Sequence, residues 1–198
     1  MRNELQNEAC LGQHLLILGD VNTGKTTLCR QWLVQLCRQG LGARIALIDM
    51  APHIPEALAL ARGMVGAGGS LMPPPASGVL DLRTHLDAPR LSSTSEAEAM
   101  AKAVRNAKAI ETLFEQLPGR RRDILFINDV TLYLQAGLAV DLLKHVAKAG
   151  ITTLVVNGYE GDRLGGGELT RREKAETQRL RQSFALEGKV LELTHRYR

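Results

Sequence analysis

The sequence contains little of what several classes of protein depend on. Aromatic residues make up 4% of the 198 residues, which leaves little material for an open groove in which nucleic-acid bases stack. The three cysteines, Cys10, Cys29 and Cys37, do not stand at a metal-ligand spacing. No apolar run approaches the roughly 18 residues that a membrane span needs. These absences argue against a single-strand groove, a cysteine-based metal centre and contact with a membrane.

Length, composition and charge predict one cytoplasmic domain over residues 1–198. The content of 44% hydrophobic and 23% charged residues is ordinary for a globular protein, and the polar N-terminus lacks a signal-peptide core. The formal charge is +4: residues 100–198 carry 17 Lys and Arg against 12 Asp and Glu, and residues 1–99 carry 8 against 9. This asymmetry is compatible with an anionic partner such as nucleic acid, and equally with ordinary solvated surface.

Short apolar runs alternate with amphipathic stretches along the chain. Several runs are unbroken apolar blocks, as is typical of parallel strands that are covered on both faces. The pattern therefore predicts an α/β fold of three layers, with a mostly parallel central sheet and helices on both faces. Strands are expected at 14–18, 44–48, 78–82, 123–128, 152–156 and 189–193. Helices are expected at 25–39, 95–117, 134–148 and 170–186, the second and fourth opened by capping boxes at Ser95 and Thr170.

One irregular insert interrupts this alternation. Residues 63–94 are rich in Gly, Pro and Ser and contain a single short candidate strand. An insert of this length in an α/β domain is typically a functional loop or partly disordered, and both readings stay open. If it is a functional loop, it is the natural place for substrate specificity.

The stretch from Gly19 to Thr26 reads GDVNTGKT and matches the phosphate-binding pattern G-x-x-x-x-G-K-[ST] in full. The glycines let successive backbone N–H groups point at an anion, and the helix that follows adds its positive dipole end. We expect Lys25 to reach the β- and γ-phosphates, Thr26 to ligate Mg²⁺ and Thr27 to donate to the α-phosphate. The predicted nucleotide-binding residues of this loop are Gly19, Asp20, Val21, Asn22, Thr23, Gly24, Lys25, Thr26 and Thr27. The sequence therefore predicts a protein that binds a nucleoside triphosphate.

Two acids follow apolar runs. Asp129 closes DILFIND and is the predicted Mg²⁺ residue together with Thr26, the alternative being a helix N-cap. Asp49 closes RIALID and is the predicted catalytic acid that positions the attacking group, the alternative being a turn residue before Pro52. After Asp129 stands Val130 instead of the water-activating Glu that ATPases of the AAA and RecA kind usually carry. This difference points to the kinase–GTPase branch of P-loop proteins.

The strand at 152–156 leads into the residues NGYE, at the place where a guanine-reading N-K-x-D motif would stand. Asn157 is kept but the Lys and the Asp are missing, so ATP is favoured over GTP, with Asn157 contacting the adenine edge. Further along, Arg163, Arg171 and Arg172 are candidates for a mobile lid over the transferred phosphate, the alternative being an exposed charged surface.

The run GDVNTGKTTL, followed at 44–52 by RIALIDMAP, resembles the polynucleotide 5′-hydroxyl kinase family, the RNA-processing kinases of archaea and eukaryotes. More broadly, the chain is similar to the SIMIBI class of P-loop proteins. The resemblance implies that Lys25 and Thr26 bind phosphates and Mg²⁺, and that Asp49 lies by the γ-phosphate or acts as the base. The family's second strand ends in an Asp-x-Asp-x-Gly-Gln run, whereas this chain continues after Asp49 as MAPH.

Together these features predict a Mg²⁺-dependent enzyme that uses ATP, with GTP as the alternative. The γ-phosphate would go either to water or to an anionic acceptor such as a polynucleotide 5′-hydroxyl. The rival hypothesis is a nucleotide-gated switch or a partner-docking, metallochaperone-type module with slow hydrolysis, for which a homodimer would be expected.

Overall fold

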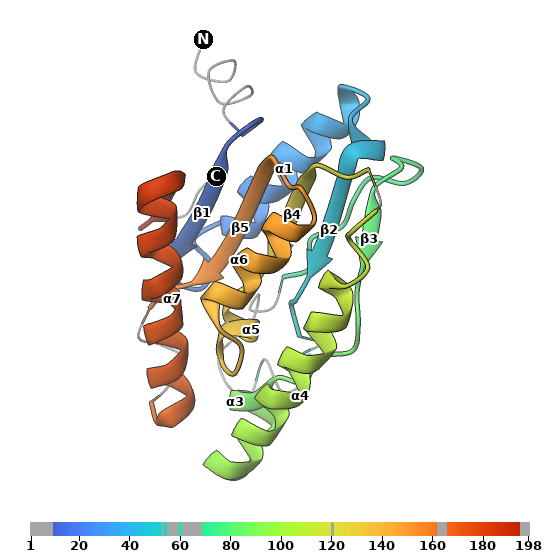
Figure 1. The fold of residues 1–198 in the computed structure, drawn as a ribbon. Helices are drawn as coiled ribbons and strands as arrows, with labels where there is room; N and C mark the ends of the chain where they lie inside the picture. The colour runs from blue at the N-terminus through green and yellow to red at the C-terminus, as the bar shows by residue number, and fades with distance from the viewer. Residues whose placement is uncertain are drawn as a thin grey trace.

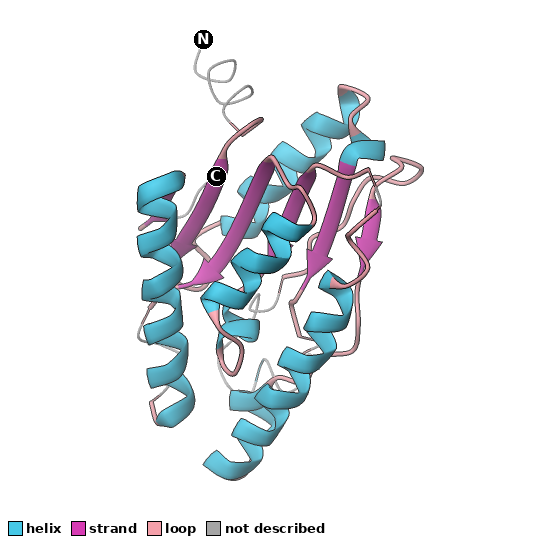
Figure 2. Cartoon of the chain, viewed as in Figure 1, coloured by secondary structure: helices cyan, strands magenta, loops and turns pink. Residues whose placement is uncertain are grey.

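The computed structural model describes residues 10–52, 54, 60, 69–119, 121–161 and 166–194, and a six-stranded sheet lies at its centre (Figures 1 and 2). The strands are β1 (His14–Gly19), β2 (Ile45–Asp49), β3 (Leu80–Leu82), β4 (Ile124–Asn128), β5 (Thr153–Tyr159) and β6 (Lys189–Leu193). Their order is β3-β2-β4-β5-β1-β6, and all the pairings are parallel. The six predicted strands are therefore confirmed, with β5 continuing to Tyr159.

Helices cover both faces of this sheet. The first face carries α1 (Lys25–Arg38), and the opposite face carries α4 (Glu96–Phe114), α6 (Ala139–Lys148) and α7 (Glu168–Glu187) (Figure 1). Shorter pieces are η1 (Gly42–Arg44), α3 (Pro89–Ser92) and α5 (Thr131–Leu134). The predicted three-layer P-loop NTPase fold, with a parallel sheet between helices, is confirmed.

The helix expected at 134–148 is in fact two helices, α5 and α6. A Cβ atom on Gly137 would lie 2.3 Å from the ring of the fully buried Tyr133, so the chain turns at a glycine that packs directly on this ring. Helix α6 then begins at Ala139, whose backbone N–H donates to Glu176 Oε2 of α7 at 2.9 Å. The break thus depends on two contacts made in the folded protein.

The two predicted capping boxes have different outcomes. Ser95 caps α4 as predicted, because its hydroxyl accepts from the backbone N–H of Glu98 at 3.2 Å. The prediction for Thr170 is wrong, because α7 already begins at Glu168, after Gly167 with its left-handed φ of +88°. Thr170 lies inside the first turn, where its hydroxyl donates to the Gly166 carbonyl at 3.1 Å.

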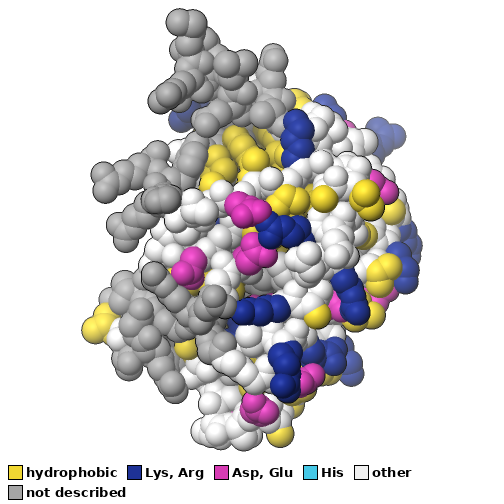
Figure 3. Space-filling model, turned by 90° about the vertical axis from the view of Figure 1, so that its left-hand side faces the viewer, with side chains coloured by type: hydrophobic (Ala, Val, Ile, Leu, Met, Phe, Trp, Pro, Cys, Tyr) yellow, Lys and Arg dark blue, Asp and Glu magenta, His cyan; other side chains and the backbone are white. Residues whose placement is uncertain are grey.

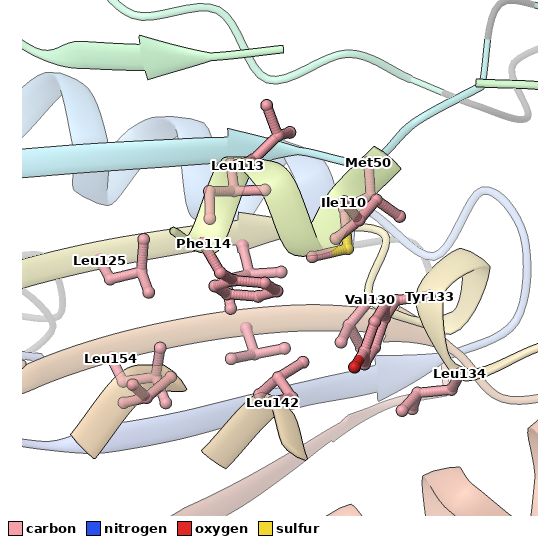
Figure 4. Close-up of a cluster of buried hydrophobic side chains, with 14 of the residues drawn as sticks. Met50, Ile110, Leu113, Phe114, Leu125, Val130, Tyr133, Leu134, Leu142 and Leu154 are labelled. Carbon is pink, nitrogen blue, oxygen red and sulfur yellow. The ribbon is translucent and has the colours of Figure 1, made fainter. Parts of the chain in front are cut away.

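Each face of the sheet has its own apolar core. Under α1, residues such as Trp32 and Leu33 pack against Phe126 and its neighbours. On the opposite face, Ile110 and Phe114 of α4 pack over Leu125 and Leu154 of the sheet, as Figure 4 shows. The unbroken apolar blocks of the sequence are thus explained, because both sides of β1, β2, β4 and β5 are buried.

The described part of the insert, residues 69–94, is built into the domain. Its strand β3 pairs with β2 in the register Ala46↔Leu80, and its helix α3 packs on α4. Arg122 donates to the carbonyl of Gly78 at 2.8 Å and to that of Ile45 at 3.0 Å, which ties the insert to the strand beside it. Residues 63–68 lie outside the described residues, and the single domain over residues 1–198 stays a prediction.

Candidate nucleotide-binding site

The predicted phosphate loop connects β1 to α1 at the edge of the sheet where the strands end. A Cβ on Gly19 would lie 2.5 Å from the Leu193 carbonyl oxygen and 2.8 Å from Thr23 Oγ1, so only glycine fits there. Gly24, the residue before α1, has a φ of +93°, which also favours glycine. Asn22 takes a left-handed φ of +61° between them. The two glycines of the motif are therefore required by close approach and by backbone conformation.

Lys25 folds back over this loop. Its Nζ donates to the Asp20 carbonyl at 2.6 Å and lies 3.5 Å from Thr23 Oγ1, while the Val21 N–H donates to Asp20 Oδ1 at 2.7 Å. Burial lowers the pKa of Lys25, and the nearby Asp129 and Asp20 raise it in turn. The first turn of α1 carries no acidic residue, and Thr27 is exposed in it. The loop, the ammonium group and the helix end therefore share one region that suits phosphate.

Asn128, the last residue of β4, is the centre of a buried polar network beside the loop. Its Oδ1 accepts from Asn157 Nδ2 at 2.7 Å and from the Thr26 hydroxyl at 3.4 Å. Its Nδ2 donates to Asp49 Oδ1 at 2.7 Å and to the Gly69 carbonyl at 2.9 Å. The side chain facing Thr26 is thus that of Asn128. It comes one residue before Asp129, which the sequence analysis predicted as the Mg²⁺ residue.

Asp49 is held by donors on both of its oxygens. Besides the Asn128 amide on Oδ1, its Oδ2 accepts from the Leu71 N–H at 3.0 Å, from Arg83 Nη1 at 2.6 Å and from the Ser70 hydroxyl. The Ala51 N–H also donates to Oδ1 at 3.2 Å. These five donors take up the about four acceptor positions of a carboxylate, and the side chain is only 2% exposed. The geometry argues against the predicted catalytic role and makes Asp49 an anchor between β2, β4 and the insert.

Asp129 follows β4 in a left-handed backbone conformation with a φ of +60°. Its Oδ1 accepts from the Thr131 hydroxyl at 2.8 Å, and its N–H donates to Asn157 Oδ1 at 3.0 Å. Burial raises the pKa of Asp129, while the Thr131 hydrogen bond and the charge of Lys25 lower it. Asp129 thus directly follows Asn128, whose side chain faces Thr26 of the phosphate loop. A non-glycine residue in this conformation beside such a loop is typical of a functional position.

Asn157 lies inside the sheet and not at a base-binding surface. It is 2% exposed, and its Nδ2 donates to Asn128 Oδ1 and to Cys29 Sγ, the latter at 3.3 Å. Its Oδ1 accepts from the Asp129 N–H. Both amide hydrogens and the oxygen are engaged, so the predicted contact with adenine is corrected: Asn157 positions Asn128 and Asp129.

Of the three predicted lid arginines, the structure describes Arg171 and Arg172. Arg171 pairs with Glu168 at 2.9 Å on the same helix, and Arg172 donates to the Ala136 carbonyl at 3.4 Å. Arg163 lies outside the described residues. The insert also contains Arg90, a basic residue that the sequence analysis did not single out.

Arg90 on α3 forms an ion pair of 2.8 Å with Glu173 on α7, where Glu173 also accepts from Gln135 Nε2 at 3.0 Å. Burial raises the pKa of Glu173, and Arg90 lowers it. The charge of Arg90 also lowers the pKa of Asp129. The basic character of Arg90 was readable in the sequence, but its partner was not.

The oxygen atoms beside Thr26 suit Mg²⁺. The Thr26 hydroxyl and the Asn128 amide oxygen lie 3.4 Å apart, and a carboxylate follows at the next residue, Asp129. Proteins hold Mg²⁺ with one or two oxygen ligands, the phosphates of the nucleotide and several waters. The described residues contain no group of three or more His, Cys, Asp or Glu that could hold a metal without such help. The donor set therefore fits Mg²⁺ that is bound together with phosphates.

A strand–loop–helix phosphate cradle at the edge of a parallel sheet defines the class: the chain has the fold of a P-loop NTPase. No protein-family model matches it, and no curated protein sequence does either. Across the described residues, the helices are all too short or too polar to cross a membrane.

Three solved structures illustrate what the chain is similar to. The flagellar accessory protein FlaH of Methanocaldococcus jannaschii aligns with a TM-score of 0.47 and 9% identity, over 92% of this chain and 71% of that one. The Pif1 helicase of Candida albicans aligns with a TM-score of 0.38 and 16% identity, over 99% and 38%. An ATPase from the type III secretion system of pathogenic bacteria aligns with a TM-score of 0.38 and 17% identity, over 83% and 49%.

Proposed function

We propose that the protein is a Mg²⁺-dependent NTPase that hydrolyses the β–γ bond of ATP. The observation that carries this proposal is the placement of Lys25, Thr26 and Asn128 at one edge of the sheet, around a loop built for phosphate. Lys25 and the N–H groups of α1 would stabilise the charge that develops on the phosphate oxygens. Thr26 and Asn128 would hold Mg²⁺, which neutralises phosphate charge when it is bound.

Asp129 is the residue we assign to the attacking water. Desolvation raises the pKa of its carboxylate, as a general base needs, and Asp129 directly follows Asn128, whose side chain faces Thr26. The sequence analysis assigned this role to Asp49. The oxygens of Asp49, however, already accept hydrogen bonds from Asn128, Arg83 and the insert. The assignment moves Asp129 from a metal ligand to the group that orients water.

One face of the molecule gives a polynucleotide acceptor little support. On the face that Figure 3 shows, Lys and Arg side chains are spread out and interleaved with Asp and Glu. ATP is preferred to GTP because the guanine-reading Lys and Asp are missing after Asn157. The polynucleotide or other anionic acceptor, the homodimer, the slow-hydrolysis switch and the cytoplasmic location all stay predictions.

The test follows γ-labelled ATP and GTP with the purified protein, in Mg²⁺ or in excess EDTA, with and without a 5′-hydroxyl oligonucleotide. We expect Mg²⁺-dependent release of labelled phosphate from ATP, and its loss in Lys25→Ala. Asp129→Asn should still bind ATP but hydrolyse it about 10² to 10⁴ times more slowly, the usual contribution of a general base. Asp141→Asn, at an exposed ion pair with Lys144, is the matched control.

The outcomes separate the candidates. Label that appears on the oligonucleotide would support the kinase instead of the hydrolase. Nucleotide binding without any transfer of label would support the switch. If the wild type and Lys25→Ala bind ATP equally weakly, the proposed function fails.

A further inference from the structure

Arg83, the residue directly after β3, uses all three nitrogen atoms of its guanidinium group within the fold. Its Nη1 donates to Asp49 Oδ2 and to Ser70 Oγ, each at 2.6 Å, and its Nη2 donates to the Leu71 carbonyl. Its Nε donates to Asp81 Oδ1 at 2.8 Å. Arg83 therefore fastens the insert to the carboxyl end of β2, where Asp49 stands.

The carboxylate that Arg83 holds orients the buried side chain of Asn128. Asn128 Nδ2 donates to Asp49 Oδ1 at 2.7 Å and to the Gly69 carbonyl at 2.9 Å. A peptide carbonyl has no hydrogen to donate, so the NH₂ end of the amide must face Gly69 and the oxygen end must face the other way. Turning the amide round would leave both acceptors without a donor, which is costly in a buried place. Gly69 and Asp49 thus determine which end of Asn128 points at the P-loop.

The oxygen end of Asn128 faces the hydroxyl of Thr26. Its Oδ1 accepts from the Thr26 hydroxyl at 3.4 Å and from Asn157 Nδ2 at 2.7 Å. A hydroxyl has one hydrogen and two lone pairs, and a metal ion binds a lone pair. Because the hydrogen of Thr26 is directed at Asn128, the lone pairs are left for Mg²⁺. Gly69 also lies against this hydroxyl, since a Cβ on it would be 3.9 Å from Thr26 Oγ1.

Building on the proposed function, we propose that the insert helps to select Mg²⁺, with Arg83 as the positioning residue. It acts through the carboxylate of Asp49 and the amide of Asn128 on the direction of the Thr26 hydroxyl. Groups that orient a metal ligand from behind typically contribute about 10- to 100-fold to metal affinity. Mg²⁺ demands a near-ideal octahedron, whereas Ca²⁺ accepts flexible coordination. Loss of the orientation should therefore weaken the binding of Mg²⁺ more than that of Ca²⁺.

The experiment measures the affinity of a β,γ-imido analogue of ATP by calorimetry in excess Mg²⁺, in excess Ca²⁺ and in EDTA. Arg83→Gln should weaken the analogue about tenfold in Mg²⁺, but less than about threefold in Ca²⁺ and less than about twofold in EDTA. Arg44→Gln is the matched control, because Arg44 Nε donates to Asp123 Oδ1 at 2.9 Å in an ion pair just before β2 and β4. These are the two strands whose other ends carry Asp49 and Asn128. The control should bind the analogue as the wild type does in all three conditions.

A purely structural role of Arg83 would give a different result. If Arg83→Gln weakens the analogue in Ca²⁺ or in EDTA as much as in Mg²⁺, or leaves the affinity in Mg²⁺ unchanged, the proposal is overturned. The same holds if Arg44→Gln reproduces the loss in Mg²⁺. Should Arg83→Gln fail to fold, Ser70→Ala decides, because it removes a hydroxyl that joins Arg83 to Asp49, and it should weaken the analogue about threefold in Mg²⁺ alone. A wild type that does not bind the analogue, or gains no affinity from Mg²⁺, would refute the proposed function itself, which distinguishes the two failures.

Discussion

Asn128→Asp is a substitution whose cost depends on the buried network beside the P-loop. The Asn128 amide nitrogen donates to Asp49 Oδ1 at 2.7 Å and to the Gly69 carbonyl at 2.9 Å. An ionised carboxylate at the same place would turn both hydrogen bonds into contacts between oxygen atoms. Arg83 already pairs with the other oxygen of Asp49. The contacts of this network therefore offer no second cation that could neutralise the introduced carboxylate.

The size of the effect follows from two terms. Loss of two hydrogen bonds, one to a charged acceptor, costs about 3 kcal/mol, and two carboxylates about 4 Å apart repel by about 4 kcal/mol at an effective dielectric constant of 20. Proton uptake limits the repulsion, so we expect Asn128→Asp to lose about 4 to 6 kcal/mol of unfolding free energy at about pH 8.5. Asn128→Ala loses all four hydrogen bonds of the side chain, about 5 kcal/mol, and this loss does not change with pH in this range.

The sign of the pH dependence is a further check. The pKa of the introduced carboxyl is raised in the folded state, so its penalty grows as the pH rises and shrinks as the pH falls. At about pH 5.5 the protonated carboxyl donates to Asp49, and the loss should fall to about 1 to 2 kcal/mol. Urea-induced unfolding, followed by far-UV circular dichroism at the two pH values, measures both variants. A loss in Asn128→Asp that differs by less than about 1 kcal/mol between the two pH values would refute the reasoning.

Two further predictions concern the P-loop and the helix behind it. Gly19→Ala should weaken ATP binding at least about tenfold, because its Cβ would lie 2.5 Å from a backbone oxygen of β6, whereas Gly166→Ala meets nothing within 4 Å and should bind normally. Equal affinities in the two variants would contradict the close packing of the loop. Burial raises the pKa of the Cys29 thiol to about 12, so Cys29 should react with an aromatic disulfide at least about tenfold more slowly than the half-buried Cys37. The Cys29→Ala variant keeps Cys37, and the Cys37→Ala variant keeps Cys29. If the two variants react with the disulfide at comparable rates, the burial of Cys29 is contradicted.

Much of the fold was predictable because its signals are local. Each strand is a contiguous apolar block, and the P-loop is a contiguous motif whose glycines serve the backbone conformation of the loop itself. The cap at Ser95 is equally local, since its partner is the N–H of Glu98 three residues on. The break between α5 and α6 was missed, because it depends on the packing of Gly137 against Tyr133 and on a hydrogen bond from α7.

The sequence by itself determined that the chain forms a parallel sheet between helices and that Gly19 to Thr26 forms a phosphate loop. Only the tertiary structure decided which side chains meet at that loop. It placed Asn128 by the Thr26 hydroxyl and gave the oxygens of Asp49 hydrogen-bond donors. It also buried Asn157 inside the sheet and paired Arg90 with Glu173. The physical reason is that buried polar groups must find partners wherever the fold brings them together. Strand order and helix packing set those partners, and neither is written in the spacing of residues along the chain.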